Sequence, residues 1–306
     1  MNNAPDFIIM GAMKCATTTL HEQLNAQPGV FMSALKEPNF FSDDDQFQRG
    51  IDWYLSLFDP AQPGELCGES STHYTKLPTY PKSVERLRQY TPNVKLIYVM
   101  RHPVERIVSQ YMHEWSTRTV TGTLSQALKR HPELYHYSQY SMQLKPYLAT
   151  FGPENVLPVF FERVKQFPQE ELARIGEFVG CPQPVVWQAT ASHQHASKER
   201  LRESAWRDAL VNAPVLSTIR KNLVPQSFRK WVKGLWQMQS RPELKPKEQA
   251  ELEAMLDQDL AILGRWLGRE LSCKNFRAAA IAPISGWVTD QMPQPKTTSA
   301  TRASVY

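Results

Sequence analysis

Cysteine is scarce in this sequence, and the few cysteines are scattered. Four occur among 306 residues, and no two of them form a Cys-x-x-Cys pair. None stands at a spacing from histidine that would make a zinc site. We therefore expect no zinc site, and we expect reduced thiols at Cys15, Cys67, Cys181 and Cys273.

The sequence also lacks an early hydrophobic run as long as a signal peptide or a membrane span needs. Residues 1–6 carry no basic cluster, and the apolar run over residues 7–10 is far too short. We expect a cytoplasmic protein that makes no membrane contact.

A large excess of one charge is absent too. The chain has 35 Lys and Arg against 30 Asp and Glu, which gives a formal net charge of +5. So mild a surplus favours a local anionic ligand over a nucleic-acid coat. We expect no nucleic-acid partner, and any basic function must be confined to one part of the molecule.

What the sequence has is an alternation of apolar strand-like runs and amphipathic helical segments. With 42% hydrophobic residues, the chain can bury the core of one large α/β domain. Strands are expected at residues 6–10, 30–33, 94–100 and 156–161, and helices at 81–90, 103–118 and 168–179. This order predicts three layers: a central, mainly parallel sheet with helices on both faces.

The last third of the chain divides into three parts. Residues 196–233 are basic and helical in pattern, with nine Lys or Arg against three acidic residues. Residues 247–267 form another clear helical pattern. Residues 280–306 are rich in Pro, Ser, Thr and Ala and show no period, so we expect one domain over residues 1–279 and a disordered tail over 280–306.

The first strand runs into a turn suited to an anion. After Gly11 come Lys14 and three successive threonines, Thr17, Thr18 and Thr19, which open a helix. Backbone N–H groups at a helix start can cradle a phosphate, and the lysine adds a full positive charge. An interpretation without function stays open, because strand–turn–helix units with capping threonines also occur for structural reasons.

This turn is not a Walker A loop. A Walker A loop ends in Gly-Lys-Ser or Gly-Lys-Thr, whereas here the lysine precedes the threonines by three residues. A P-loop kinase or other nucleotide-binding protein that uses MgATP therefore remains a second hypothesis. No convincing Walker B aspartate supports it.

A second motif ends the strand at residues 94–100. Arg101 follows this strand at the edge where open α/β sheets bind ligands, and its guanidinium can grip a phosphate with two N–H groups. Ser109 lies two helical turns further on and can present its hydroxyl to the same group. A surface ion pair at the strand end is the alternative interpretation of Arg101.

Together the two motifs resemble the family of sulfotransferases that use 3'-phosphoadenosine 5'-phosphosulfate (PAPS). Arg101 and Ser109 match that family's 3'-phosphate site, and the resemblance implies a P-loop-like fold for a sulfotransferase domain over residues 1–279. The first loop resembles the family's 5'-phosphosulfate loop, usually written GxxKxGTT, with Ala16 where that loop has glycine; its residues here are Lys14, Cys15, Ala16, Thr17, Thr18 and Thr19.

The segment from Lys36 to Tyr54 resembles the heparan-sulfate-type sulfotransferases and their bacterial relatives. The resemblance implies that Glu37 is the catalytic base and that Lys36 lies beside the donor or the substrate. A surface carboxylate paired with Lys36 is the other interpretation of Glu37. Further departures from the family pattern occur at three places, namely Asn39 where some relatives have histidine, Ser70 where several have lysine, and Lys274 near an expected tryptophan.

The implied reaction moves a sulfuryl group from PAPS in line onto a hydroxyl, or less favourably an amine, of a glycan or small-molecule acceptor. Adenosine 3',5'-bisphosphate leaves, and no metal is expected. Lys14 would neutralise charge on the departing oxygen, while Glu37 would accept the proton of the acceptor. The sequence identifies neither the acceptor nor the oligomeric state.

Two weaker candidates complete the predicted site. His113 and Glu114 follow Ser109 by one turn and would face the acceptor, unless they are simply surface residues. A basic loop would close over the nucleotide, unless it is a solvated helix; its residues are His195, Ser197, Lys198, Arg200 and Arg202. A third hypothesis makes residues 196–233 a peripheral module that binds a polyanion or a membrane.

Overall fold

The fold is built on one sheet of five parallel strands. The computed structural model describes residues 4–189, 240–284 and 286–292. The strands lie in the order β2-β3-β1-β4-β5, and all the pairings between neighbours are parallel. Their bounds are β1 Phe7–Gly11, β2 Val30–Met32, β3 Leu66–Ser70, β4 Lys95–Met100 and β5 Val156–Phe160.

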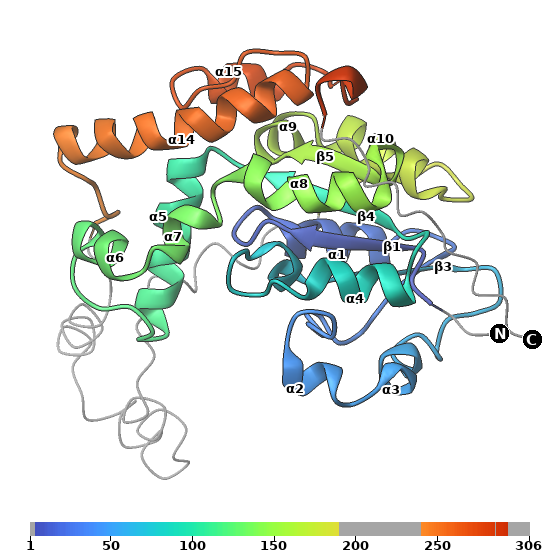
Figure 1. Cartoon of the computed structure of the whole chain (residues 1–306). Coiled ribbons are helices and arrows are strands. Elements are labelled where there is room, and N and C mark those ends of the chain that lie inside the picture. Colours follow the sequence, from blue (N-terminus) through green and yellow to red (C-terminus); the bar gives the residue numbers. More distant parts are fainter. Residues whose placement is uncertain (1–3, 190–239, 285, 293–306) are drawn as a thin grey trace, which may run out of the picture.

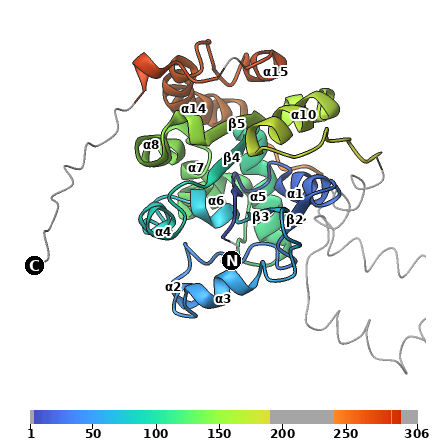
Figure 2. The ribbon, with the colours of Figure 1, turned by 90° about the vertical axis from the view of Figure 1, so that its right-hand side faces the viewer.

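Helices cover both faces of this sheet. Figure 2 shows α4 (Ser83–Tyr90) and α8 (Tyr140–Phe151) on one side, and α1 (Thr17–Asn25) and α10 (Pro168–Val179) on the other. The inner strands β1 and β4 are buried almost along their whole length, as a sheet covered on both faces requires. The expected three-layer α/β fold of the P-loop-like class is confirmed.

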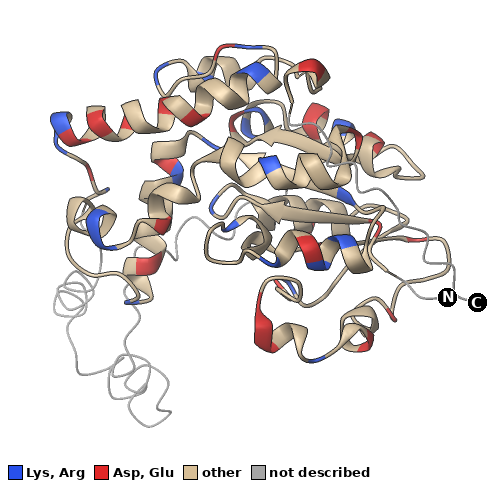
Figure 3. Cartoon of the chain, viewed as in Figure 1, with Lys and Arg blue, Asp and Glu red and all other residues tan. Residues whose placement is uncertain are grey.

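The remaining helices extend the edges of the sheet. Helix α5 (Pro103–Ser116) leaves the end of β4 and is followed by α6 (Leu124–Arg130) and α7 (Glu133–His136). Helix α9 (Phe161–Gln166) follows β5 directly, and α14 (Pro246–Trp266) and α15 (Phe276–Ile281) pack above it in Figure 1. Acidic and basic residues are mixed over the described helices (Figure 3), and none of these helices combines the length and apolarity of a membrane span.

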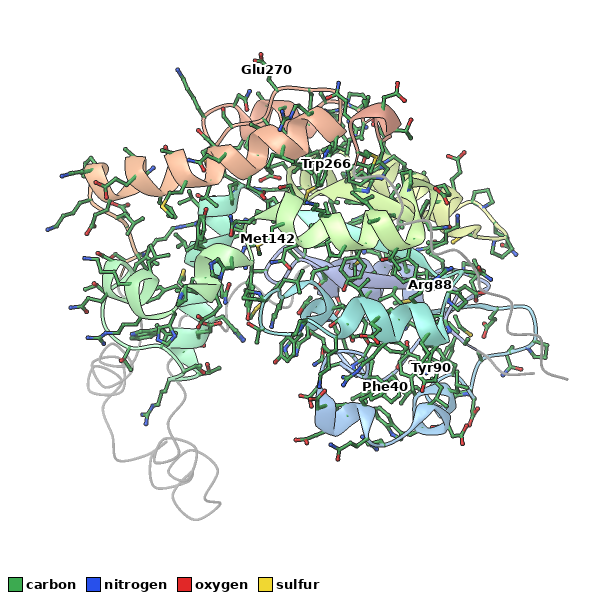
Figure 4. All side chains as sticks on the ribbon, in the orientation of Figure 1. Phe40, Arg88, Tyr90, Met142, Trp266 and Glu270 are labelled. Carbon is green, nitrogen blue, oxygen red and sulfur yellow. The ribbon has the colours of Figure 1, made fainter. Side chains whose placement is uncertain are left out.

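An aromatic cluster packs below the sheet around α2 (Asp44–Phe47) and α3 (Ile51–Ser56). The rings of Phe40 and Tyr54 stack with their centroids 4.8 Å apart, and Phe41 meets Tyr54 edge-on at the same separation. Figure 4 shows Phe40 and Tyr90 between α4 and this segment. These rings anchor the chain that follows Glu37 to the core.

The sequence analysis missed strand β3. Its residues Leu66-Cys-Gly-Glu-Ser70 include glycine and two polar residues and no β-branched side chain, so the local pattern gives little strand signal. The position of this segment in the sheet makes it a strand, because it pairs on both sides, with β1 and with β2. The strand carries a fully buried glutamate, Glu69, which accepts hydrogen bonds from the hydroxyls of Tyr54, Tyr74 and Ser71.

The expected tail boundary at residue 279 falls inside helix α15, which runs to Ile281. Beyond it, the indole N–H of Trp287 donates to the carbonyl of Val156 at 2.7 Å, and the N–H of Val288 donates to the carbonyl of Trp266. These contacts join residues 286–292 to the folded domain. The carbonyls of Ile281 and Pro283 accept hydrogen bonds from Arg163 and Arg269, so residues 280–284 belong to the domain as well, which corrects the expectation for the start of the tail. Residues 293–306 lie outside the described part of the chain.

Gly68 in β3 offers a direct test of this packing. A Cβ atom there would lie 2.3 Å from the Phe7 ring and 2.7 Å from the Met32 sulfur. We expect Gly68→Ala to lower the free energy of unfolding by about 1–3 kcal/mol because of overpacking, as measured by urea denaturation. The control Gln89→Ala, on the exposed side of α4, should change it by no more than about 0.5 kcal/mol; equal effects would contradict the packing.

Candidate active site

A cavity of about 690 Å³ opens at the carboxyl ends of β1, β3 and β4. These strands are adjacent in the sheet, so the turns that follow them meet at one edge. Residues far apart in the sequence are brought together there. Those predicted residues that line the cavity are Lys14, Ala16, Thr17, Thr18, Thr19, Glu37, Arg101, Ser109 and His113.

The loop after β1 wraps around one end of the cavity in an unusual backbone conformation. Lys14 and Ala16 both have positive φ, of 70° and 65°. Ala16 is the residue before the first turn of α1, and its side chain cannot cap the helix. The threonines therefore follow the cap position and face the cavity, contrary to the interpretation that made them caps.

Cys15 is the one residue of the predicted loop that does not line the cavity. Its thiol is fully buried, and burial raises its pKa to about 12, so the thiol is neutral. Its backbone N–H donates within the loop, to the carbonyl of Ala12 at 3.2 Å. Cys15 thus holds the loop to the core, and the role predicted for it in cofactor binding finds no support in this geometry.

Arg101 connects the loop after β1 to the turn after β4. Its Nη1 atom donates to the carbonyl of Lys14 at 3.4 Å, and its guanidinium lies 4.8 Å from the centroid of the Phe161 ring. Its Nη2 atom lies 3.4 Å from a carboxylate oxygen of Glu105. Arg101 thus forms the ion pair of the alternative interpretation and also lines the cavity together with Ser109, while its phosphate-binding role stays a prediction.

Glu105 forms ion pairs with three arginines, two of which are distant in the sequence. Besides Arg101, its carboxylate pairs with Arg241 and with Arg277, the latter at 3.2 Å. Arg241 also lines the cavity, although the sequence analysis had not selected it. Only the Arg101–Glu105 spacing of four residues was visible beforehand, since the other two contacts depend on the tertiary fold.

Glu37 faces the cavity and is also paired with its neighbour. Lys36 Nζ lies 3.2 Å from one carboxylate oxygen, and the hydroxyl of Thr72 donates to the other at 3.0 Å. Burial alone would raise the pKa of Glu37, but Lys36, Thr72 and Lys76 together hold this pKa below its ordinary value. The carboxylate is therefore ionised at neutral pH and can accept a proton. Lys36 itself does not line the cavity.

The 3-10 turn after β3, Thr72–Thr75, supplies residues that sequence reasoning missed. Thr72, His73 and Lys76 all line the cavity. His73 stacks on Tyr80 with ring centroids 4.7 Å apart, and burial lowers its pKa to about 4, so it is neutral. The sequence analysis did not select these residues, because it had not recognised strand β3, which precedes them.

Two departures from the family pattern lie near this turn. Ser70 is fully buried and forms a hydrogen bond of 2.9 Å with Nδ1 of His21, so it faces α1 and does not line the cavity. Asn39 has a positive φ of 52°, and its buried Oδ1 atom has no hydrogen-bond partner among the described residues. Lys274 is exposed.

Of the other predicted residues, the structure describes Glu114 but not the predicted closing loop. Glu114 lies outside the cavity wall, where its carboxylate accepts a hydrogen bond of 2.7 Å from Gln110. The residues of the predicted closing loop fall outside the described part of the chain, namely His195, Ser197, Lys198, Arg200 and Arg202. Within the described ranges no cluster of His, Cys, Asp and Glu has a geometry that would hold a metal ion.

These features define an α/β protein in which a loop with a lysine and three threonines shares a cavity with an ionised carboxylate. Comparison with known proteins adds the family: a model of the sulfotransferase domain matches residues 4–264, so the chain belongs to the sulfotransferase family. The resemblance seen in the sequence is thereby confirmed, and the kinase hypothesis loses its basis.

Individual relatives fit this assignment. Human heparan sulfate glucosamine 3-O-sulfotransferase 6 is 29% identical over 190 residues, which cover 60% of this chain and 54% of that protein. Human heparan sulfate glucosamine 3-O-sulfotransferase 5 is 33% identical over 190 residues, covering 58% and 54%. The chain thus spans about half the length of these curated relatives.

A solved structure shares the fold. The sulfotransferase from Alicyclobacillus acidocaldarius superimposes with a TM-score of 0.61 at 24% identity, and the match covers 88% of this chain and 97% of that one. This likeness supports the fold assignment.

The backbone at Ala16 leads to a prediction about stability. Because alanine is strained at φ 65° and glycine is not, we expect Ala16→Gly to raise the free energy of unfolding by about 1 kcal/mol. The control Ala26→Gly changes an exposed residue at φ −84°, where glycine should instead cost about 0.5–1 kcal/mol. Chemical denaturation of both variants measures whether the free energy of unfolding rises in Ala16→Gly and falls in Ala26→Gly. If both variants are destabilised, the backbone at Ala16 is not strained.

Proposed function

We propose that this protein is a sulfotransferase that moves a sulfuryl group from PAPS to a hydroxyl of its acceptor. One observation carries the proposal: the Lys14 loop and Arg101 meet on one cavity, with Arg101 Nη1 3.4 Å from the Lys14 carbonyl. Two such elements so close together suit a nucleotide whose ribose carries a phosphate at both its 5' and its 3' position.

The donor would lie along the ends of β1 and β4. Its phosphosulfate would occupy the Lys14 loop, whose three threonines line the cavity, and would be bound there by their hydroxyls and by backbone N–H groups. Its 3'-phosphate would reach Arg101 and Ser109, one strand away. Arg241, held near Arg101 through Glu105, adds a further positive charge to that end.

The proposed chemistry is an in-line displacement at sulfur. The acceptor oxygen forms a bond to sulfur while the bond between sulfur and the bridging phosphate oxygen breaks, and the acceptor proton passes to Glu37. Lys14 neutralises the charge that develops on the bridging oxygen, and adenosine 3',5'-bisphosphate leaves. No metal takes part in the proposed mechanism.

The names of the similar proteins guide our proposal for the chemical class of the acceptor. Those named above are heparan sulfate glucosamine 3-O-sulfotransferases, which favours a glycan hydroxyl over other nucleophiles. A smaller hydroxyl-bearing molecule would present the same reacting group. We therefore assign the acceptor only as far as its reacting group.

Ligand choice tests the donor assignment. Adenosine 3',5'-bisphosphate at about a hundred times its dissociation constant should raise the free energy of unfolding by about 2.7 kcal/mol, and it should do so without magnesium. A thermal-shift assay shows this as a rise in Tm. Stabilisation by MgATP alone, with none by adenosine 3',5'-bisphosphate, would contradict the proposal.

A kinetic variant tests the base. Glu37→Gln keeps the size of the side chain and one acceptor oxygen, but it replaces the other oxygen with an NH2 donor and cannot take up the acceptor proton, so turnover should fall by about a hundredfold to ten-thousandfold. Binding of adenosine 3',5'-bisphosphate should stay within about twofold, as measured by calorimetry. The control Glu85→Gln, an exposed residue in α4, should leave both unchanged; full turnover in Glu37→Gln would remove Glu37 from this role.

A further inference from the structure

Lys76 is an almost buried lysine at the end of the 3-10 turn after β3. Only 8% of the residue is exposed, and it lines the cavity. Its Nζ atom lies 5.8 Å from the centroid of the Tyr137 ring. The ammonium forms no hydrogen bond or ion pair with any residue that the structure describes, whereas the ammonium of Lys36 is paired with Glu37.

The charged groups that face Lys76 are already engaged elsewhere. Glu37 holds Lys36 and Thr72, and Glu114 on α5 accepts from Gln110. Arg106, also on α5, is fully buried and adds a second positive charge that opposes protonation of Lys76. Neighbouring His73 is neutral. Glu37 and Glu114 thus attract the ammonium of Lys76, but no carboxylate among the described residues forms an ion pair with it.

Such an arrangement destabilises the folded protein. Burial disfavours the charged ammonium and lowers the pKa of Lys76 to about 8, despite the attraction of Glu37 and Glu114. Buried charges are normally paired, because an unpaired one loses its hydration without compensation. A cation kept in this state on the wall of an anion-binding cavity is suited to a ligand that supplies the missing negative charge.

We propose that Lys76 is the cation of an oxyanion subsite at the Glu37 end of the cavity. The inference rests on the proposed function and extends it to the end of the cavity that faces the acceptor. The oxyanion has two possible sources: the sulfuryl group in transfer, or an anionic substituent on the acceptor. Ser70, where several relatives carry lysine, turns toward His21, and Lys76 presents an ammonium to the cavity instead.

The test uses inorganic sulfate as the probe, on the full chain saturated with adenosine 3',5'-bisphosphate. The nucleotide fills the Lys14 loop and the Arg101 region, which leaves Lys76 to bind sulfate. We expect Lys76→Met to weaken sulfate binding at least tenfold in calorimetry and to change nucleotide binding by less than about twofold. The control Lys145→Met, on the exposed side of α8, should alter neither, and Lys76→Arg should retain sulfate binding.

Two further readouts separate this role from a structural one. Near neutral pH, Lys76→Met should melt at a higher temperature than the wild type, because the buried charge is gone. Sulfate binding to the wild-type complex should weaken as the pH rises past about 8, where Lys76 loses its proton, and should stay flat in Lys76→Met. A destabilised Lys76→Met, with no such pH dependence in the wild type, would overturn the proposal.

Hydrolysis of PAPS in the absence of any acceptor distinguishes the two sources of the oxyanion. If Lys76→Met slows this hydrolysis, the subsite serves the sulfuryl group; if the rate is unchanged, it serves the acceptor. Sulfate affinity that is equal in wild type and Lys76→Met overturns the subsite while leaving the sulfotransferase assignment intact. Failure of the wild type to bind adenosine 3',5'-bisphosphate would instead refute the proposed function.

Discussion

The contact between Arg101 and the backbone of Lys14 is the interaction on which the account of the site depends. It exists because β4 lies next to β1 and both strands point the same way, so their carboxyl ends share one edge. On the other side of β1, strand β3 delivers Thr72 and Lys76 to the same edge and fixes Glu37 through a backbone hydrogen bond to Ser70. The order β3-β1-β4 thus places Glu37, the Lys14 loop and Arg101, for which we propose the roles of base and phosphate binders, on one cavity.

The same edge of the sheet carries features that lower the stability of the fold. Lys14, Ala16 and Glu37 adopt positive φ, which costs of the order of 1–3 kcal/mol for each residue that is not glycine. Lys76 adds a buried positive charge without a counter-ion among the described residues. Such features cluster where binding or catalysis requires a fixed geometry, and the large buried core around β1 and β4 offsets their cost.

The sequence predicted those parts of the molecule whose signal is local. Apolar runs and helix patterns identified β1, β2, β4 and β5, and the two motifs identified Lys14, Arg101 and Ser109, all of which line the cavity. Strand β3 was not predicted, because Gly68 and Glu69 serve contacts with distant parts of the chain. Gly68 allows the close approach of Phe7, and Glu69 accepts buried hydrogen bonds from tyrosines. With β3 unseen, Thr72, His73 and Lys76 could not be placed, and the three-arginine cluster on Glu105 depends on contacts 136 and 172 residues apart in sequence.

The measurement that tests the central claim most directly compares two nucleotides on the same pair of variants. If one adenine nucleotide bridges the two anion-binding elements, Arg101→Met should weaken binding of adenosine 3',5'-bisphosphate at least tenfold and leave that of adenosine 5'-monophosphate unchanged, while Lys14→Met should weaken both. Equal losses for the two nucleotides in Arg101→Met, or no loss in either variant, would contradict the shared site.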